Sequence, residues 1–214
     1  MFYEIFRVFG ILTGYPLLWL FFKTKVFYEG KKNKKWKKGG NLIISNHFSI
    51  IDYILVCFMA FPRKLTAVAS EMPFKTGIGR FGMRFFGTIQ ANREIKDMSF
   101  IEKSAEVLSK GKLVQIFPEA KNTPDGKIHE FKPSYIRIAE MAGCKIVPVI
   151  TDGNYGLFKR TSVIIGEEID LIKILGWNDE FDLTKEQVDK ANEIIYKKSL
   201  ELRARLEELK NKRK

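Results

Sequence analysis

The chain has 214 residues, of which 45% are hydrophobic and 29% are charged. This length and composition predict one domain with a real apolar core, and they exclude a wholly disordered chain. Its two cysteines form no C-x-x-C pattern, which excludes a disulfide scaffold and a cysteine zinc site. Its two histidines are too few for a histidine-rich metal cluster, so we expect no metal.

The net charge of +12 lies mainly at the two ends of the chain. Residues 1–38 carry +7 and residues 203–214 carry +4, which leaves only +1 for the residues between them. A nucleic-acid binder more often spreads its positive charge over one face of the folded body. The distribution therefore indicates a nearly neutral globular body with two basic ends.

The amino-terminal segment begins with an apolar stretch. Between Arg7 and Lys23 lie 15 uncharged, mostly apolar residues. As one helix they would reach about 22 Å, which is shorter than the roughly 30 Å hydrocarbon core of a bilayer. Gly14 and Pro16 favour a break into two short helices.

A polybasic run follows this apolar stretch over 31–38, with six lysines around Trp36. Lysines near a membrane attract anionic headgroups by about 1 kcal/mol each, and tryptophan prefers the interface. We predict that 1–38 associates with the membrane on the cytoplasmic face of the cell membrane, either monotopically or with one inserted segment. The alternative is a buried core helix over 8–22 followed by a solvated loop.

From residue 39 onward, strand and helix signals alternate, and this predicts a single α/β domain over 39–214 with a largely parallel central sheet flanked by helices. The predicted strands are 42–45, 65–70, 113–117, 145–151 and 162–170. The predicted helices are 50–61, 100–112, 133–144 and a long amphipathic helix over 184–209. Ser99 and Glu102 have the spacing of a capping box at the start of the second helix.

The segment Asn46-His47-Phe48-Ser49-Ile50-Ile51-Asp52 lies where the first of these strands leads into a helix. Sites in α/β proteins lie at the carboxyl ends of parallel strands. The Asp52 carboxylate could accept the proton on one nitrogen of His47 and leave the other nitrogen free as a base. The alternative is structural: His47 caps the helix, and Asp52 stabilises its positive end.

This segment also resembles block I of the glycerolipid acyltransferases, the family of bacterial 1-acylglycerol-3-phosphate acyltransferases. Three further blocks follow in the family's order, and the resemblance as a whole covers about residues 25–151. Gly87-Thr88-Ile89-Gln90-Ala91-Asn92-Arg93 resembles block II, Phe117-Pro118-Glu119 block III and Ile146-Val147-Pro148-Val149 block IV, with Phe131-Lys132 resembling the Phe-Lys between the last two.

The resemblance implies transfer of a fatty acyl group from acyl-CoA or acyl-carrier protein, as co-substrate, to the hydroxyl of lysophosphatidate, without a cofactor or covalent intermediate. His47 would be the general base and Asp52 its orienting group. Arg93 would hold the acceptor phosphate, Glu119 would position the acceptor's polar head, and Pro148 would shape the acyl or thioester side. The remaining residues expected to bind substrate are Asn46, Ser49, Gly87, Pro118, Lys121 and Lys132.

The chain departs from the family pattern in block III, which usually continues Phe-Pro-Glu-Gly-Thr-Arg-Ser. Here the glycine position holds Ala120 and the arginine position holds Asn122, which carries no charge for a phosphate. Lys121 could supply that charge. The departure leaves two alternatives open: an acyltransferase for another alcohol or amine acceptor, or a non-catalytic basic module that binds membrane or nucleic acid.

A G-x-G-x-x-G match over 77–82 lies between blocks I and II. A dinucleotide loop must directly follow a strand and open a helix, but Pro73 and Lys75 separate this match from the strand over 65–70. We therefore expect it to be a link beside the acyl tunnel or the membrane, and not a nucleotide site.

Overall fold

The computed structural model describes residues 8–10, 12–14, 16, 20–21, 23–30, 38–49, 51–92, 98–156, 159–177 and 182–212. Trp36, Arg93 and most of the polybasic run lie outside the described residues, as does part of the predicted amino-terminal helix. Within this part of the chain, no helix combines the length and the apolar character that a bilayer crossing requires.

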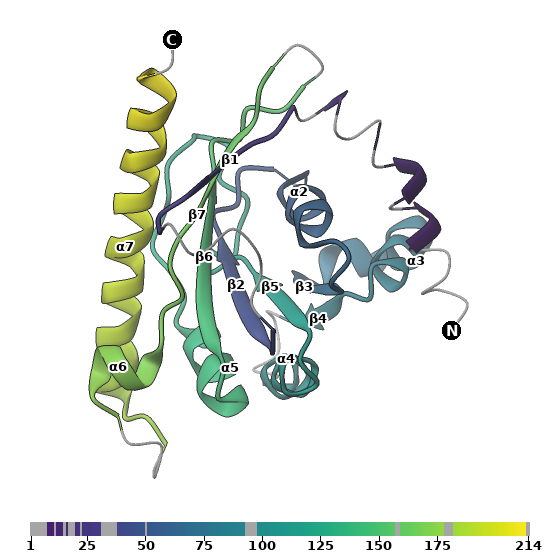
Figure 1. The fold of residues 1–214 in the computed structure, drawn as a ribbon. Helices are drawn as coiled ribbons and strands as arrows, with labels where there is room; N and C mark the ends of the chain where they lie inside the picture. Colours follow the sequence, from purple (N-terminus) through teal and green to yellow (C-terminus); the bar gives the residue numbers. More distant parts are fainter. Residues whose placement is uncertain are drawn as a thin grey trace.

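One seven-stranded sheet forms the centre of the molecule, in the order β1-β7-β6-β2-β5-β3-β4 (Figure 1). The strands are β1 (Lys25–Tyr28), β2 (Asn41–Ser45), β3 (Leu65–Ser70), β4 (Ile89–Ala91), β5 (Leu113–Ile116), β6 (Lys145–Thr151) and β7 (Ser162–Ile165). Neighbouring strands are parallel except β6 and β7, which pair antiparallel. The predicted α/β fold with a largely parallel sheet is confirmed.

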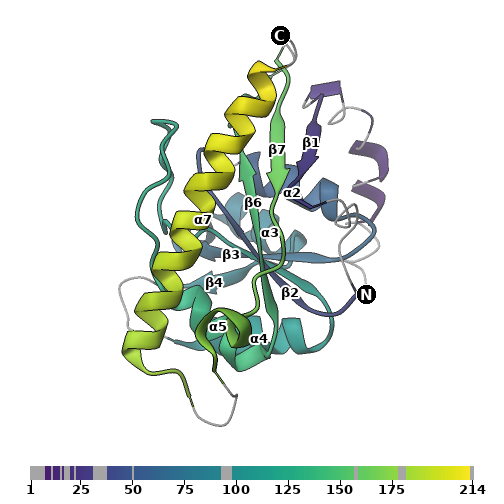
Figure 2. The same ribbon diagram turned by 60° about the vertical axis from the view of Figure 1, so that its left-hand side comes forward.

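Helices cover both faces of this sheet (Figures 1 and 2). They are α2 (Ile51–Ala60), the 3₁₀ helix η1 (Met72–Lys75), α3 (Gly77–Phe85), α4 (Ser99–Ser109), α5 (Ser134–Ala142), α6 (Leu171–Leu175) and α7 (Lys185–Asn211). The apolar sides of α4, α5 and α7 pack into one core cluster, and α2 packs into a second cluster on the other face. The sheet is therefore buried between two helical layers.

The amphipathic pattern of the last helix determines how it packs. Val188, Ala191, Ile195, Leu202 and Leu206 recur at helical spacing and are all buried. The helix begins at a capping box, in which the Thr184 hydroxyl accepts from the backbone N–H of Gln187 and the Gln187 side chain accepts from the backbone N–H of Thr184. In Figure 2, α7 crosses the whole height of the sheet.

Two local predictions are wrong. Helix α4 begins at Ser99 with Met98 at its N-cap and no side-chain cap, so Ser99 and Glu102 form no capping box. The strand predicted over 162–170 ends at Ile165. Beyond it, the Gly166 N–H donates to the Pro148 carbonyl of β6 at 2.9 Å, and the chain then pairs with β6 at a single bridge between Ile169 and Ile146.

The sequence did not predict strands β1 and β4 or the helices η1, α3 and α6. Strand β1 lies at one edge against β7, and β4 lies at the other edge against β3. The G-x-G-x-x-G segment forms most of α3, which follows η1 and not a strand. The expectation that it is not a dinucleotide loop therefore agrees with its place in the fold.

Candidate active site

The block I segment lies at the carboxyl end of β2, between the carboxyl ends of its neighbours β5 and β6. His47 comes two residues after the strand, and Asp52 lies in the first turn of α2. Ser49 makes the turn between them: its carbonyl accepts from the Asp52 N–H at 3.1 Å, and its hydroxyl accepts from the Ile51 N–H at 3.3 Å. The chain therefore folds back so that the imidazole of His47 lies beside the carboxylate of Asp52.

The two side chains form the predicted pair. His47 Nδ1 lies 3.2 Å from Asp52 Oδ2, which also accepts the Ser49 N–H at 2.8 Å. An ionised carboxylate only accepts hydrogen bonds, so Nδ1 carries the proton of the neutral imidazole and Nε2 keeps its lone pair. The Asp52 side chain is 1% exposed and that of His47 is 21% exposed. A buried carboxylate thus orients an imidazole that solvent or a substrate can reach.

The ring of His47 is also confined by an aromatic neighbour. Phe117, directly after β5, stacks on the imidazole with ring centroids 4.0 Å apart and planes 21° apart. Stacking on one side and a hydrogen bond at Nδ1 leave the imidazole little freedom to rotate. Such preorganisation favours a base that must meet its proton in one geometry.

Glu119 fixes the backbone of the same segment. Its Oε1 accepts the His47 N–H at 3.0 Å, and its Oε2 accepts from the Thr123 hydroxyl and the His129 N–H, both at 2.9 Å. The carboxylate is 3% exposed. Glu119 thus ties the loop after β5 to the loop over 46–49 that carries His47 (the histidine loop). Its expected contact with the acceptor's polar head stays a prediction.

The residue after Glu119 explains why the family pattern has glycine there. Ala120 has φ of 56°, in the left-handed region that costs a residue with a Cβ about 1–2 kcal/mol. Ala120 lies at the end of a turn in which its N–H donates to the Phe117 carbonyl at 3.0 Å. Ala120 therefore adopts a backbone conformation that glycine adopts without strain.

Other residues expected to bind substrate contact the protein itself. Asn46 is fully buried, and its amide group pairs with the backbone of Thr151 through two hydrogen bonds of 3.1 and 2.9 Å. Ser49 forms the turn described above. Pro118 is buried, and its carbonyl accepts the Lys132 N–H at 2.8 Å. These residues therefore position the loops around His47.

The remaining expected residues divide by location. Lys121 and Lys132 are exposed on the loop after β5. Gly87 has φ of 65° and lies in the turn before the amino end of β4. It therefore lies apart from His47, which is at the carboxyl ends of the strands. Pro148 pairs with Ile44 inside the sheet and lies beside Gly166, on the side that α7 covers. Arg93 lies outside the described residues.

Tyr155 also belongs to this site, although no sequence motif predicts it. The hydroxyl of Tyr155 donates to Asp52 Oδ1. Tyr155 lies in the loop after β6 and belongs to none of the four blocks. Its only sequence signal is its place four residues after a predicted strand whose carboxyl end reaches the site.

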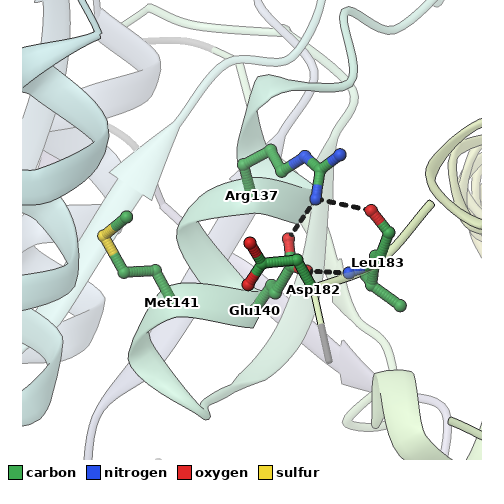
Figure 3. A pocket seen from close by; sticks show the side chains of 5 residues that line it. All are labelled: Arg137, Glu140, Met141, Asp182 and Leu183. Carbon is green, nitrogen blue, oxygen red and sulfur yellow. Dashed lines mark hydrogen bonds and ion pairs between the residues drawn. The ribbon is translucent and has the colours of Figure 1, made fainter. Parts of the chain in front are cut away.

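A separate pocket lies at the far end of α5 (Figure 3). It is lined by Arg137, Glu140, Met141, Asp182 and Leu183. Arg137 Nη1 donates to Glu140 Oε2 at 2.8 Å and to the Leu183 carbonyl at 2.9 Å, so the charged groups here hold α5 to the segment before α7. The last turn of α5 leads into the amino end of β6, whereas His47 lies at the carboxyl ends.

Comparisons with known proteins agree with this geometry. A family model described as Acyltransferase matches residues 25–152, which is more than half of the chain. A 1-acyl-sn-glycerol-3-phosphate acyltransferase from Cocos nucifera is 22% identical over 198 residues, covering 89% of this chain and 61% of that protein. A chloroplastic enzyme of the same name from Arabidopsis thaliana is 23% identical over 149 residues, covering 69% and 40%. The chain thus spans less than two thirds of the length of each of these relatives.

A solved structure shares the fold. It is the 1-acyl-sn-glycerophosphate (LPA) acyltransferase PlsC from Thermotoga maritima, with a TM-score of 0.62 and 23% identity, covering 97% of this chain and 79% of that one. With the family model, the four blocks in order and the His47–Asp52 pair at the carboxyl ends of the strands, these findings establish that the chain belongs to the acyltransferase family.

Proposed function

We propose that the chain transfers a fatty acyl group from acyl-CoA or acyl-carrier protein to the free hydroxyl of lysophosphatidate, which yields phosphatidate. The observation that carries this proposal is the pairing of His47 Nδ1 with the buried Asp52 carboxylate, which leaves Nε2 available as a base. The names of the relatives, 1-acyl-sn-glycerol-3-phosphate acyltransferases, support this acceptor.

The chemistry needs no covalent enzyme intermediate and no cofactor. Nε2 of His47 takes the proton from the acceptor hydroxyl as its oxygen attacks the thioester carbonyl. The carbonyl oxygen becomes an oxyanion, and its collapse breaks the carbon–sulfur bond. The imidazolium, stabilised by Asp52, then returns the proton to the departing thiolate. The products are the ester and the free thiol.

The acceptor phosphate requires positive charge close to His47. Lys121 and Lys132 are exposed on the loop after β5, which Glu119 ties to the histidine loop. We propose that these lysines act with Arg93 on the phosphate. A lysine binds phosphate as a point charge, without the bidentate geometry of arginine. The site would therefore hold its acceptor less rigidly than one with an arginine in block III.

A second candidate is an acyltransferase for a different alcohol or amine acceptor. The observation that favours it is Asn122, an exposed, uncharged residue where the family's block III has arginine. The same base chemistry would serve any acceptor whose hydroxyl or amine reaches Nε2 of His47. The two candidates differ in the charge that the acceptor must carry.

The acceptor and product are lipids, and we propose that the protein works at the membrane surface. Ile78 and Phe81 of α3 are 90% and 63% exposed, and Met72 of η1 is 62% exposed. Arg80 and Arg84 lie on the same helix. Exposed apolar side chains among cations suit the interface of an anionic leaflet. This supports placement on the cytoplasmic face, with residues 1–38 as a further contact.

Product analysis tests these proposals directly. Purified protein would be incubated with an acyl-CoA or an acyl-carrier protein, and with lysophosphatidate or its dephosphorylated monoacylglycerol counterpart in vesicles. Phosphatidate that forms only with lysophosphatidate supports the first candidate. Equal transfer to the uncharged acceptor favours the second candidate, and no ester product with any pair would contradict the first.

A further inference from the structure

The carboxylate of Asp52 has two oxygens, and only one of them pairs with His47. Oδ2 accepts from Ser49 N–H and from the imidazole, whereas Oδ1 accepts the hydroxyl of Tyr155. At 1% exposure, Asp52 needs protein donors on both oxygens, because a buried charge without hydrogen bonds is costly. Tyr155 thus supplies a hydrogen-bond donor to Oδ1 of Asp52.

The hydroxyl of Tyr155 is a dependable donor. Burial, followed by the charge of Asp52, raises the pKa of Tyr155 far above its ordinary value, so the proton stays on the oxygen. Thr151 Oγ1 lies 3.3 Å from the same hydroxyl. Because the Tyr155 proton goes to Asp52, the Thr151 hydroxyl is the donor in that contact. The hydrogen bonds therefore run in one direction, from Thr151 through Tyr155 to Asp52.

The loop that carries Tyr155 is held from two other elements. Asp152 Oδ1 accepts the N–H groups of Asn154 at 3.0 Å and of Ser162, at the start of β7, at 3.1 Å. Its Oδ2 pairs with Lys210 Nζ of α7 at 3.0 Å. The geometry of the loop is thus set before any substrate arrives.

Close packing at Gly153 restricts the same loop. Gly153 has φ of 69°, and a Cβ there would lie 2.8 Å from the ring of Phe48, the residue next to His47. The Phe48 ring is covered in turn by the Arg203 guanidinium of α7, 5.4 Å from its centroid. Only glycine allows this approach, so the loop after β6 and the histidine loop fit together at one fixed spacing.

We propose that Tyr155 is a positioning residue for the catalytic pair: it fixes Asp52, and through Asp52 it sets the orientation of His47. The link to acyl transfer rests on the proposed function. Among the residues that the structure describes, the ionisable groups that hydrogen-bond to His47 are Asp52 from α2 and Glu119 from the loop after β5, and Tyr155 from the loop after β6 hydrogen-bonds to Asp52. Tyr155 lies beyond residues 25–152, which the family model matches, so no block motif assigns this role.

The test compares Tyr155→Phe with a matched control, Tyr135→Phe. Both changes remove one buried hydroxyl and keep the ring, but Tyr135 donates to Asn192 Oδ1 between α5 and α7. We expect Tyr155→Phe to lower kcat about tenfold or more, as for loss of a hydrogen bond to a charged group. KM for the thioester should stay the same, and Tyr135→Phe should keep the wild-type kcat.

A second readout needs no substrate. The chain has two histidines, so a His129→Gln background leaves His47 as the single source of imidazole signals in a histidine-labelled NMR sample. We expect Tyr155→Phe to shift the Nδ1–H resonance, because all of the Asp52 charge then faces the ring, and we expect Tyr135→Phe to leave it in place.

The two readouts separate the possible failures. An unchanged resonance in Tyr155→Phe overturns the proposal, whatever happens to kcat, because Tyr155 would then act elsewhere. A shifted resonance together with a wild-type kcat also overturns the proposal, because Tyr155 would then have no role in the reaction. A shifted resonance in a protein whose wild type transfers no acyl group would support the coupling of Tyr155 to the pair and reject the proposed function instead.

Discussion

His47 is positioned by groups from the first turn of α2 and from the loop after β5, and not by Asp52 alone. Asp52 binds Nδ1, Phe117 stacks on the ring and Glu119 accepts the backbone N–H. Asp52, Glu119 and His47 carry recognisable motif spacings, so the sequence predicts them. Tyr155 carries none, because its role depends on the turn after β6 and on the packing of Phe48 against Gly153.

Ala120 gives a prediction at the same scale. The residue has φ of 56°, and glycine relieves the 1–2 kcal/mol strain of this conformation at some cost in unfolded-chain entropy. We expect Ala120→Gly to raise the free energy of unfolding by about 0.5–1 kcal/mol. Ala142→Gly, at the last residue of α5, is the control and should lower it, because glycine has a lower helix propensity than alanine. Urea denaturation measures both, and a lower stability of Ala120→Gly would contradict the strain argument.

Local sequence patterns predict the central strands and the main helices, but they do not predict the two edge strands of the sheet. Continuous apolar runs predict β2, β3, β5 and β6, and helical periodicity predicts α2, α5 and α7. Strands β1 and β4 are four and three residues long. Each is stabilised by a partner strand, and β1 pairs with β7, which lies far away in the sequence. Short edge strands of this kind leave no periodic signal.

Helix α7 packs as part of the core, and this can be measured. Leu206 is fully buried against the sheet side, whereas Leu200 of the same helix is 39% exposed. We expect Leu206→Ala to lower the free energy of unfolding by about 2–5 kcal/mol, since it leaves a cavity. Leu200→Ala should cost well under half as much. Equal losses in a urea titration would show that α7 does not pack on this face.

Across the whole molecule, the exposed apolar residues of η1 and α3 define a candidate membrane face. Fully burying an isoleucine or phenylalanine contributes about 1.5–3 kcal/mol. We therefore expect Ile78→Ser with Phe81→Ser to weaken binding to anionic vesicles about tenfold or more. Met141→Ser, which changes a 58% exposed residue at the far end of α5, is the control.

Vesicle sedimentation at low and high salt distinguishes the apolar contribution to membrane binding from the electrostatic one. The apolar substitutions should weaken it at both salt concentrations, while added salt should weaken the contribution of the basic residues. Equal binding by the double variant and the Met141→Ser control would mean that α3 does not face the lipid.

The central claim is that His47 is the base of the reaction, and one comparison tests it most directly. Thiol release from an acyl thioester in the presence of lysophosphatidate would be measured for the wild type, His47→Ala and His129→Ala. His129 is the other histidine of the chain, and its ring pairs with Asp125 Oδ2 at 2.8 Å. We predict that His47→Ala loses about 10²–10⁴-fold in rate, while His129→Ala keeps the wild-type rate. Acceptor-dependent thiol release that continues at the wild-type rate in His47→Ala would contradict the account.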